Sequence, residues 1–329
     1  MSRFFMYAFM AAVIAAAMIA TGCIANQSTA QTVPATTTGP VVSATSTLAS
    51  SAEIPAVTPT PASVSKPLET MPAVLPTVNV PAGSVAQYYV YTLNGKTGVL
   101  PLALSTSVHG VYQNTSEPSA IGGNSSYYLS FINDPAQQTT IAALAAAIKD
   151  TTDVPSEQAR IAASLVQHIP AYDGPVYQYP YEVLYNDKGT SGEKSLLLAA
   201  LLKQLGFGSA VFSFADEGHL ASGVSAPSPY DYAGTGYALI ETTEPAIITD
   251  DSTTFASGQT HTNPVVIVAG NGRTLDTVSL DYMDARTWIS IMKSSPHLSD
   301  MQSQQLESLN TKYDLSYFTC QICNQSATV

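Results

Sequence analysis

The segment that most constrains the fold of this chain is a helix without a polar face. Residues 190–205 have a helical composition, and from Leu196 to Leu202 they are apolar on nearly every side. A helix of this kind must be covered all round by other elements, so it predicts the centre of a packed core. Thr190 and Glu193 have the spacing of a capping box that starts the helix, and Gly206 ends it.

The N-terminal part of the chain cannot add to that core. Residues 24–84 contain three charges, nine prolines and no Tyr, Phe or Trp. The segment therefore buries too little surface to offset its ordering entropy, and we expect a disordered Thr/Ser/Pro/Ala-rich tether. Residues 85–329 are enough for one large domain or a core with an added subdomain. We expect a β-rich N-terminal subdomain with a first helix over 85–150, and the main domain with a helical C-terminal tail over 151–329.

The first 23 residues predict export from the cytoplasm. Arg3 precedes an uncharged apolar run over residues 4–20, and small residues lead to Cys23. This is the pattern of a signal peptide, and its end resembles a lipobox in which Cys23 is lipidated and becomes the mature N-terminus. An uncleaved signal anchor or a conventional cleavage site are the alternatives. All three interpretations place the domain outside the cytoplasm, and we expect it on the extracellular face of the cytoplasmic membrane, held there by a lipid anchor.

Charge and cysteine content narrow the function classes. The net charge of -12 and the pI near 4.6 argue against a nucleic-acid partner, which needs a basic surface. Cys320 and Cys323 form a C-x-x-C that predicts a small disulfide in an exported chain, with no second pair for a zinc site. We therefore expect no metal and no cofactor. The other histidines lack metal spacing and are interpreted as structural or surface residues: His109, His168, His261 and His297.

The apolar periodicity of the domain predicts an α+β fold with an antiparallel sheet. The order expected is strands first, then helices that include the buried one, then further strands and two closing helices. Strands are expected at 86–93, 98–104, 127–132, 209–214, 220–224, 236–242 and 264–269. Helices are expected around 141–148, 155–169, 190–205, 284–293 and 299–309, with an extended Tyr- and Pro-rich stretch at 177–185.

Three motifs then make the sequence specific. Gly-Thr-Ser-Gly-Glu-Lys-Ser at 189–195 opens the buried helix, Gly-His-Leu-Ala-Ser-Gly-Val follows at 218–224, and Gly-Tyr-Ala-Leu-Ile-Glu-Thr-Thr follows at 236–243. Together with Val-Gln-His-Ile-Pro at 166–170 and Tyr-Pro-Tyr-Glu-Val-Leu at 179–184, this order resembles the transglutaminase-like domains of archaeal surface proteins. Those domains belong to the papain-like superfamily, so the resemblance implies a transglutaminase-like fold with the nucleophile-position helix packed on the sheet.

The resemblance also implies a triad. In the family a Cys begins the buried helix, a His lies on a neighbouring strand and an acid on the next strand; His219 and Glu241 match the last two. Ser191 stands at the cysteine position. A helix N-terminus lowers the pKa of a thiol and the His completes the ion pair, whereas an alcohol stays protonated and needs base catalysis with an oxyanion site. The first-turn serine could also serve only the helix end.

Three functions follow from these residues. The leading one is a surface-anchored transglutaminase-like protein with impaired catalysis that binds peptides or proteins or supports the cell envelope. The alternative is an active hydrolase or acyltransferase that uses Ser191, His219 and Glu241, and the third is a purely architectural protein with a vestigial cleft. Tyrosines around the expected cleft predict peptide contacts, or else core packing: Tyr179, Tyr181 and Tyr237.

Overall fold

The computed structural model describes residues 75–115, 124–172, 177–214, 218–249, 263–294 and 298–315. The expected signal peptide with Cys23, the tether up to residue 74, the C-x-x-C of Cys320 and Cys323, and both His261 and His297 lie outside these residues. In the part that is described, no helix combines the length and the apolarity that a membrane crossing requires. The fold of this part is α+β, and its two sheets are antiparallel.

The first element is a long β-hairpin. Strands β1 (Ser84–Leu93) and β2 (Lys96–Ser105) pair in register through a two-residue turn. Asn94 and Gly95 in this turn have φ of 51° and 75°, which is the left-handed pair that a type I′ hairpin needs. The hairpin lies along helix α4 (Pro155–His168), and the Tyr89 hydroxyl donates to the Leu184 carbonyl oxygen at 2.7 Å. The strands predicted at 86–93 and 98–104 are thus confirmed.

A group of helices follows the hairpin. Helix α1 (Thr106–Gln113) was not predicted; α2 (Asn124–Ile132), the short η1 (Pro135–Gln137) and α3 (Gln138–Thr151) come next. Helix α2 contradicts the strand predicted at 127–132. Its buried side chains Tyr127 and Phe131 are four residues apart, so they share one helix face. Burial of this face outweighs the β propensity of the aromatic residues.

Helix α5 (Pro180–Asn186) contradicts the extended stretch predicted at 177–185. Local residues explain where this helix begins. Pro180 occupies the first turn, and the Glu182 carboxylate accepts a hydrogen bond from the backbone N–H of Tyr179 at 3.0 Å. Proline at the first helical position with Glu two residues later is a helix-start signal, which the high tyrosine content obscured.

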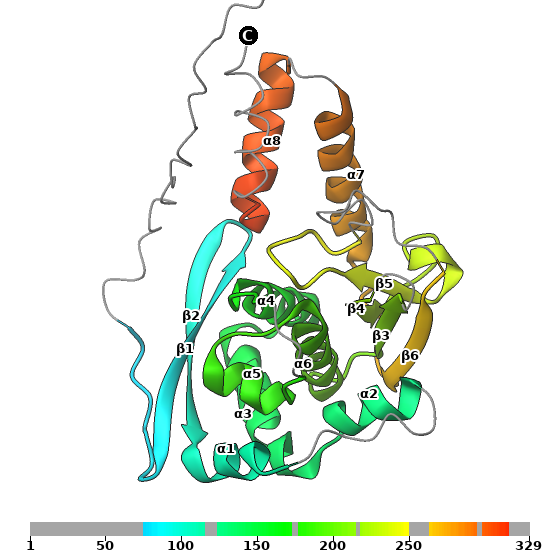
Figure 1. Ribbon diagram of the computed structural model, residues 1–329. Coiled ribbons are helices and arrows are strands. Elements are labelled where there is room, and N and C mark those ends of the chain that lie inside the picture. The colour runs from blue at the N-terminus through cyan, green and yellow to red at the C-terminus, as the bar shows by residue number, and fades with distance from the viewer. Residues whose placement is uncertain are drawn as a thin grey trace, which may run out of the picture. The chain divides into compact units, whose positions relative to one another are not determined.

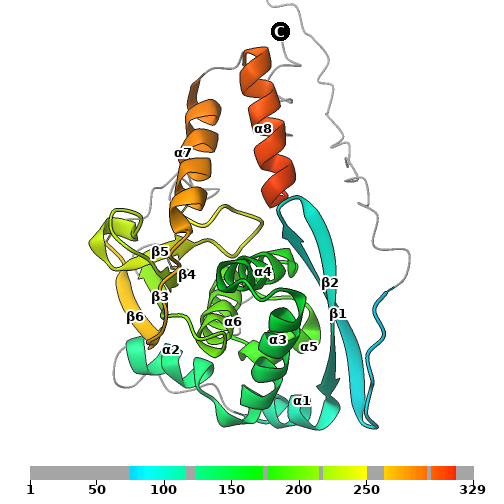
Figure 2. The ribbon, with the colours of Figure 1, turned by 180° about the vertical axis from the view of Figure 1, so that it is seen from behind.

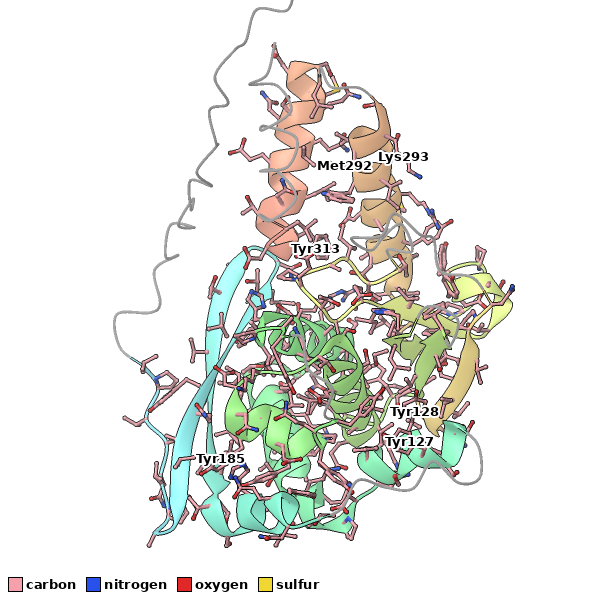
Figure 3. The ribbon with its side chains drawn as sticks, viewed as in Figure 1. Tyr127, Tyr128, Tyr185, Met292, Lys293 and Tyr313 are labelled. Atoms are coloured by element: carbon pink, nitrogen blue, oxygen red, sulfur yellow. The ribbon has the colours of Figure 1, made fainter. Side chains whose placement is uncertain are left out.

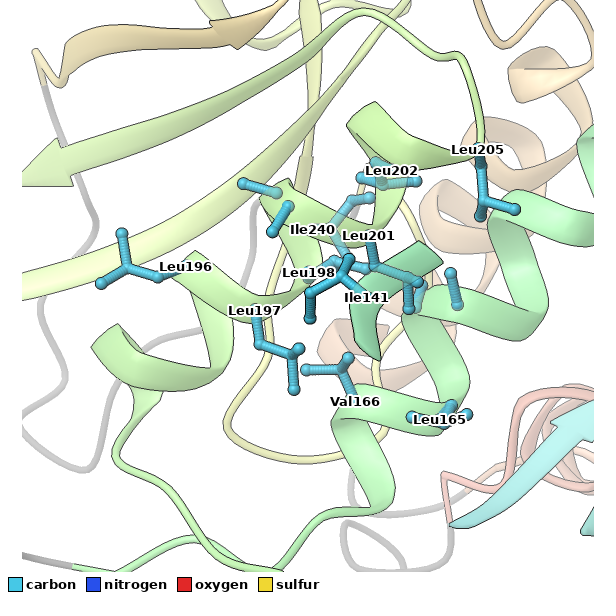
Figure 4. Packing of buried hydrophobic residues seen from close by; sticks show 14 of the residues in the cluster. Ile141, Leu165, Val166, Leu196, Leu197, Leu198, Leu201, Leu202, Leu205 and Ile240 are labelled. Atoms are coloured by element: carbon cyan, nitrogen blue, oxygen red, sulfur yellow. The ribbon is translucent and has the colours of Figure 1, made fainter. Parts of the chain in front are cut away.

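Helix α6 (Ser191–Gln204) is the predicted all-apolar helix, and helices α2, α3, α4 and α5 all pack against it. Its leucines meet Ile141, Leu165 and Val166 from the neighbouring helices and Ile240 from the sheet (Figure 4). The buried side chains of residues 85–150 belong to the same hydrophobic cluster as those of the later helices. The boundary expected at residue 150 therefore does not separate two cores.

A four-stranded sheet covers one side of α6. It contains β3 (Ser209–Phe214), β4 (His219–Ser225), β5 (Tyr237–Ile240) and β6 (Val265–Gly270) in the order β5-β4-β3-β6, and it forms where strands were predicted. Helices α7 (Val278–Ser294) and α8 (Asp300–Tyr313) lie side by side beyond the sheet (Figures 1 and 2).

Polar contacts attach the α7–α8 pair to α4. The Arg160 guanidinium donates to both carboxylate oxygens of Asp281, at 3.0 and 2.6 Å. His168 Nε2 is 2.8 Å from an Asp314 carboxylate oxygen, just past the end of α8. Tyr313, at the end of α8 nearest the β1–β2 turn (Figure 3), donates to Asp284 at 2.8 Å. The end of α4 is thereby attached to the residue that follows α8.

Because α6 is the centre of the core, truncation there is expected to be costly. Leu201 is fully buried, and Leu201→Ala is expected to lower the free energy of unfolding by about 2–5 kcal/mol through lost transfer energy and an unfilled cavity. Leu280→Ala on α7, where the side chain is 58% exposed, is the control and should change it by less than about 0.5 kcal/mol. Urea denaturation measures both, and equal effects would contradict the central place of α6.

Candidate active site

The N-terminus of α6 meets the start of β4 and the end of β5, and two hydroxyls join them. Ser195 Oγ, one turn into α6, lies 2.8 Å from Thr242 Oγ1 and donates to the carbonyl oxygen of Leu220 at 3.1 Å. The Thr242 hydroxyl donates in turn to the Ser191 carbonyl oxygen at 3.0 Å. Sequence reasoning missed Ser195 and Thr242, which bring the three predicted triad positions into one region.

Two members of the predicted triad are in contact. His219 Nε2 is 3.0 Å from a Glu241 carboxylate oxygen, and both side chains are buried. The other Glu241 oxygen accepts from the N–H groups of Thr242 and Thr243 at 2.8 and 2.9 Å, and from the Thr243 hydroxyl at 2.8 Å. Burial alone would raise the Glu241 pKa, but the hydrogen bond and charge of His219, with the Thr243 contacts, lower it to about 2.

The third member, Ser191, occupies the first position of α6 and is partly exposed. The predicted capping box is present: Thr190 Oγ1 accepts from the Glu193 N–H at 3.3 Å, and the Glu193 carboxylate accepts from the Thr190 N–H at 2.8 Å. Within the part of the chain that the structure describes, no hydrogen bond joins the Ser191 hydroxyl to His219. The acid–base pair is therefore formed, while the contact between nucleophile and base is not.

Lys194 and Glu193 are both fully buried, so each charge needs partners within the protein. The Lys194 ammonium donates to the carbonyl oxygens of Gln167, Ile169 and Thr243 at 3.2, 2.6 and 3.0 Å. These carbonyls come from the end of α4 and from the segment after β5. A lysine inside an otherwise apolar helix was the sequence signal for such partners, since a buried charge has to be paired.

Glu193 and two glutamines complete the polar layer around the site. The Glu193 carboxylate accepts from the backbone N–H of Gln178 at 2.7 Å and from its side-chain amide at 3.1 Å. The Gln167 amide donates to the carbonyl oxygens of Glu241 and Ala246 at 2.8 and 3.0 Å. The backbone at Glu241 and in the segment that follows it is thus fixed by side chains from α4 and α6.

Two of the three tyrosines expected near the cleft, Tyr179 and Tyr181, are buried. Tyr181 is 0% exposed and its hydroxyl donates to the Ser105 carbonyl oxygen at 2.6 Å. Tyr179 is 6% exposed, and its ring packs at a tilt against Phe131, with the ring centroids 4.7 Å apart. Tyr237 is half-buried in a separate cluster with Phe212 and its neighbours. Tyr179 and Tyr181 thus keep their rings inside the core, which favours the alternative of core packing, and a role in peptide binding stays a prediction. Among the described residues, no three acidic, His or Cys side chains gather as metal ligands would.

The low pKa of Glu241 predicts a pH-dependent contribution to stability. Because this pKa is about 2 in the folded protein against an ordinary 4.5, ionised Glu241 stabilises the fold above about pH 4.5 and loses that contribution as the pH falls toward 2. Glu241→Gln is expected to lower the free energy of unfolding at pH 6 by up to about 3 kcal/mol. The gap in this free energy between the unchanged protein and the variant should shrink as the pH falls. Urea denaturation between pH 2.5 and 6 tests this, with Glu307→Gln on the exposed face of α8 as the control. A gap that is constant with pH would contradict the ionised pair.

No protein-family model matches the chain, and neither the curated proteins nor the solved structures give a match to it. The resemblance to transglutaminase-like domains therefore remains a prediction that rests on the motifs at 189–195, 218–224 and 236–243.

Proposed function

We propose that this protein is a transglutaminase-like protein of the papain-like superfamily, held at the cell surface through Cys23, whose catalysis is impaired and which binds peptides or proteins there. The observation that carries the proposal is the buried His219–Glu241 pair, kept at 3.0 Å beside a helix whose first residue is Ser191. An acid that holds a histidine in place by one ring nitrogen is the arrangement that a catalytic triad uses to orient its base.

The serine explains the impairment. A cysteine at position 191 would rest as a thiolate, stabilised by the N-terminal dipole of α6 and by a protonated His219. The serine hydroxyl stays protonated at neutral pH, so it needs His219 within hydrogen-bond distance to take its proton during attack. That contact is not formed between these two described residues. The remaining site is thus better suited to binding than to turnover.

The helix end offers groups that suit a peptide. The N–H groups of Ser191 and Gly192 precede the capped N–H of Glu193, and first-turn N–H groups are donors for a carbonyl oxygen. Ser191 is partly exposed, while the charged residues behind it are enclosed. A peptide carbonyl would accept hydrogen bonds at this position, and the tether would present the site to polypeptides near the membrane.

Restoring the thiol tests the proposal. Ser191→Cys is expected to react with iodoacetamide at position 191, and combining it with His219→Gln should slow the reaction at least about tenfold, because the thiolate loses its ion-pair partner. Peptide mapping by mass spectrometry separates this label from any on Cys23, Cys320 or Cys323. A rate that does not depend on His219 would contradict a preserved site and favour a vestigial one.

The unchanged protein distinguishes binding from catalysis. We expect a serine-directed phosphonate to leave Ser191 unmodified, because the described His219 makes no hydrogen bond to the Ser191 hydroxyl. Intact-mass measurement after incubation, with Ser191→Ala as the matched control, detects the adduct. An adduct that forms on the unchanged protein and is lost in Ser191→Ala would establish the alternative, an active triad of Ser191, His219 and Glu241.

A further inference from the structure

Lys194 is a buried cation with all its hydrogen-bond donors in use. It lies in the first turns of α6 and is 0% exposed. An ammonium has three N–H donors, and the three carbonyl oxygens it contacts belong to Gln167, Ile169 and Thr243. Because all three are acceptors, the arrangement needs the protonated amine. The contacts join three segments that are distant in the sequence: the end of α4, the start of α6 and the loop after β5.

One residue connects this cation to the candidate acid. Thr243 gives its carbonyl oxygen to Lys194 at 3.0 Å, while its N–H and hydroxyl donate to the Glu241 carboxylate at 2.9 and 2.8 Å. A shift of Thr243 would therefore move both donors away from Glu241. Gln167 adds a second link, because its carbonyl oxygen binds Lys194 and its side-chain amide binds the Glu241 carbonyl oxygen.

The charges around Lys194 agree with this role. Burial lowers the Lys194 pKa to about 8, against the attraction of Glu241 and Glu244, so the amine is mostly charged at pH 7. The end of α4 faces it with the carbonyls of Gln167 and Ile169, and neighbouring Glu193 on α6 bonds instead to Gln178. Glu241 and Glu244, both after β5, are thus the acids whose charge acts on it.

We propose that Lys194 is a positioning residue that holds the loop of Thr243 in the conformation in which the Glu241 carboxylate meets His219. The inference concerns the site on which the proposed function rests, and it assigns to Lys194 the orientation of the acid. It applies whether the site binds or turns over its ligand.

The titration of His219 tests the proposal without any substrate. The full chain is prepared with ¹⁵N-labelled histidine, and the His219 ring signals, assigned by their loss in His219→Gln, are followed against pH. Loss of a nearby cation alone would ease protonation of His219 and raise the pH midpoint, whereas loss of the carboxylate contact lowers it. Lys194→Met is therefore expected to lower the midpoint by about half a pH unit or more, toward the value in Glu241→Gln.

Two further variants complete the design. Lys194→Gln also lacks the ammonium but leaves a polar group near the three carbonyls, so it provides the measurement if the methionine is not tolerated. Lys203→Met removes an exposed lysine from the other end of α6 and should leave the midpoint unchanged. An unchanged or raised midpoint in either folded Lys194 variant would overturn the proposal. The result is independent of the labelling of position 191, so the proposed function can fail while this inference stands.

Discussion

Helix α6 can be stable only where other elements enclose it, because its middle has no polar face to leave in water. Four helices and the sheet supply that cover. Enclosure extends to the first turns of the helix, where Glu193, Lys194 and Ser195 are all buried. Polar groups in such a position must find partners within the protein, and the partners available are the ends of the covering elements. The candidate site lies where those ends meet.

Two adjacent residues of opposite charge, Glu193 and Lys194, make most of these contacts. Glu193 binds the segment before α5 through Gln178, and Lys194 binds the end of α4 and Thr243 after β5. Each charge is costly to bury, and the cost is offset because nearly every donor and acceptor is used. None of these contacts involves the side chain at position 191. A cysteine or a serine there would leave the fold the same, although the chemistry of the site would differ.

The sequence allowed prediction where one local pattern decides the structure. The apolar run from Leu196 to Leu202 was of this kind, and so was the capping box at Thr190. Helix α2 was missed because its aromatic residues favour a strand locally, whereas burial of Tyr127 and Phe131, four residues apart, on one helix face stabilises the helix. The partners of Lys194 are backbone carbonyls far away in the chain, which no spacing can indicate. His219 and Glu241 were predicted from a resemblance, and the described geometry brings them together.

The most direct test of the account is a crystal structure of the Ser191→Cys variant. Under the proposed function, the His219–Glu241 pair is kept in the place where a thiol would use it. It predicts that Glu241 stays within about 3 Å of His219 Nε2 and that Sγ at position 191 lies within about 4 Å of Nδ1. If the pair is intact but the sulfur points away from the imidazole with no alternative rotamer in reach, the region is a structural junction rather than a preserved site.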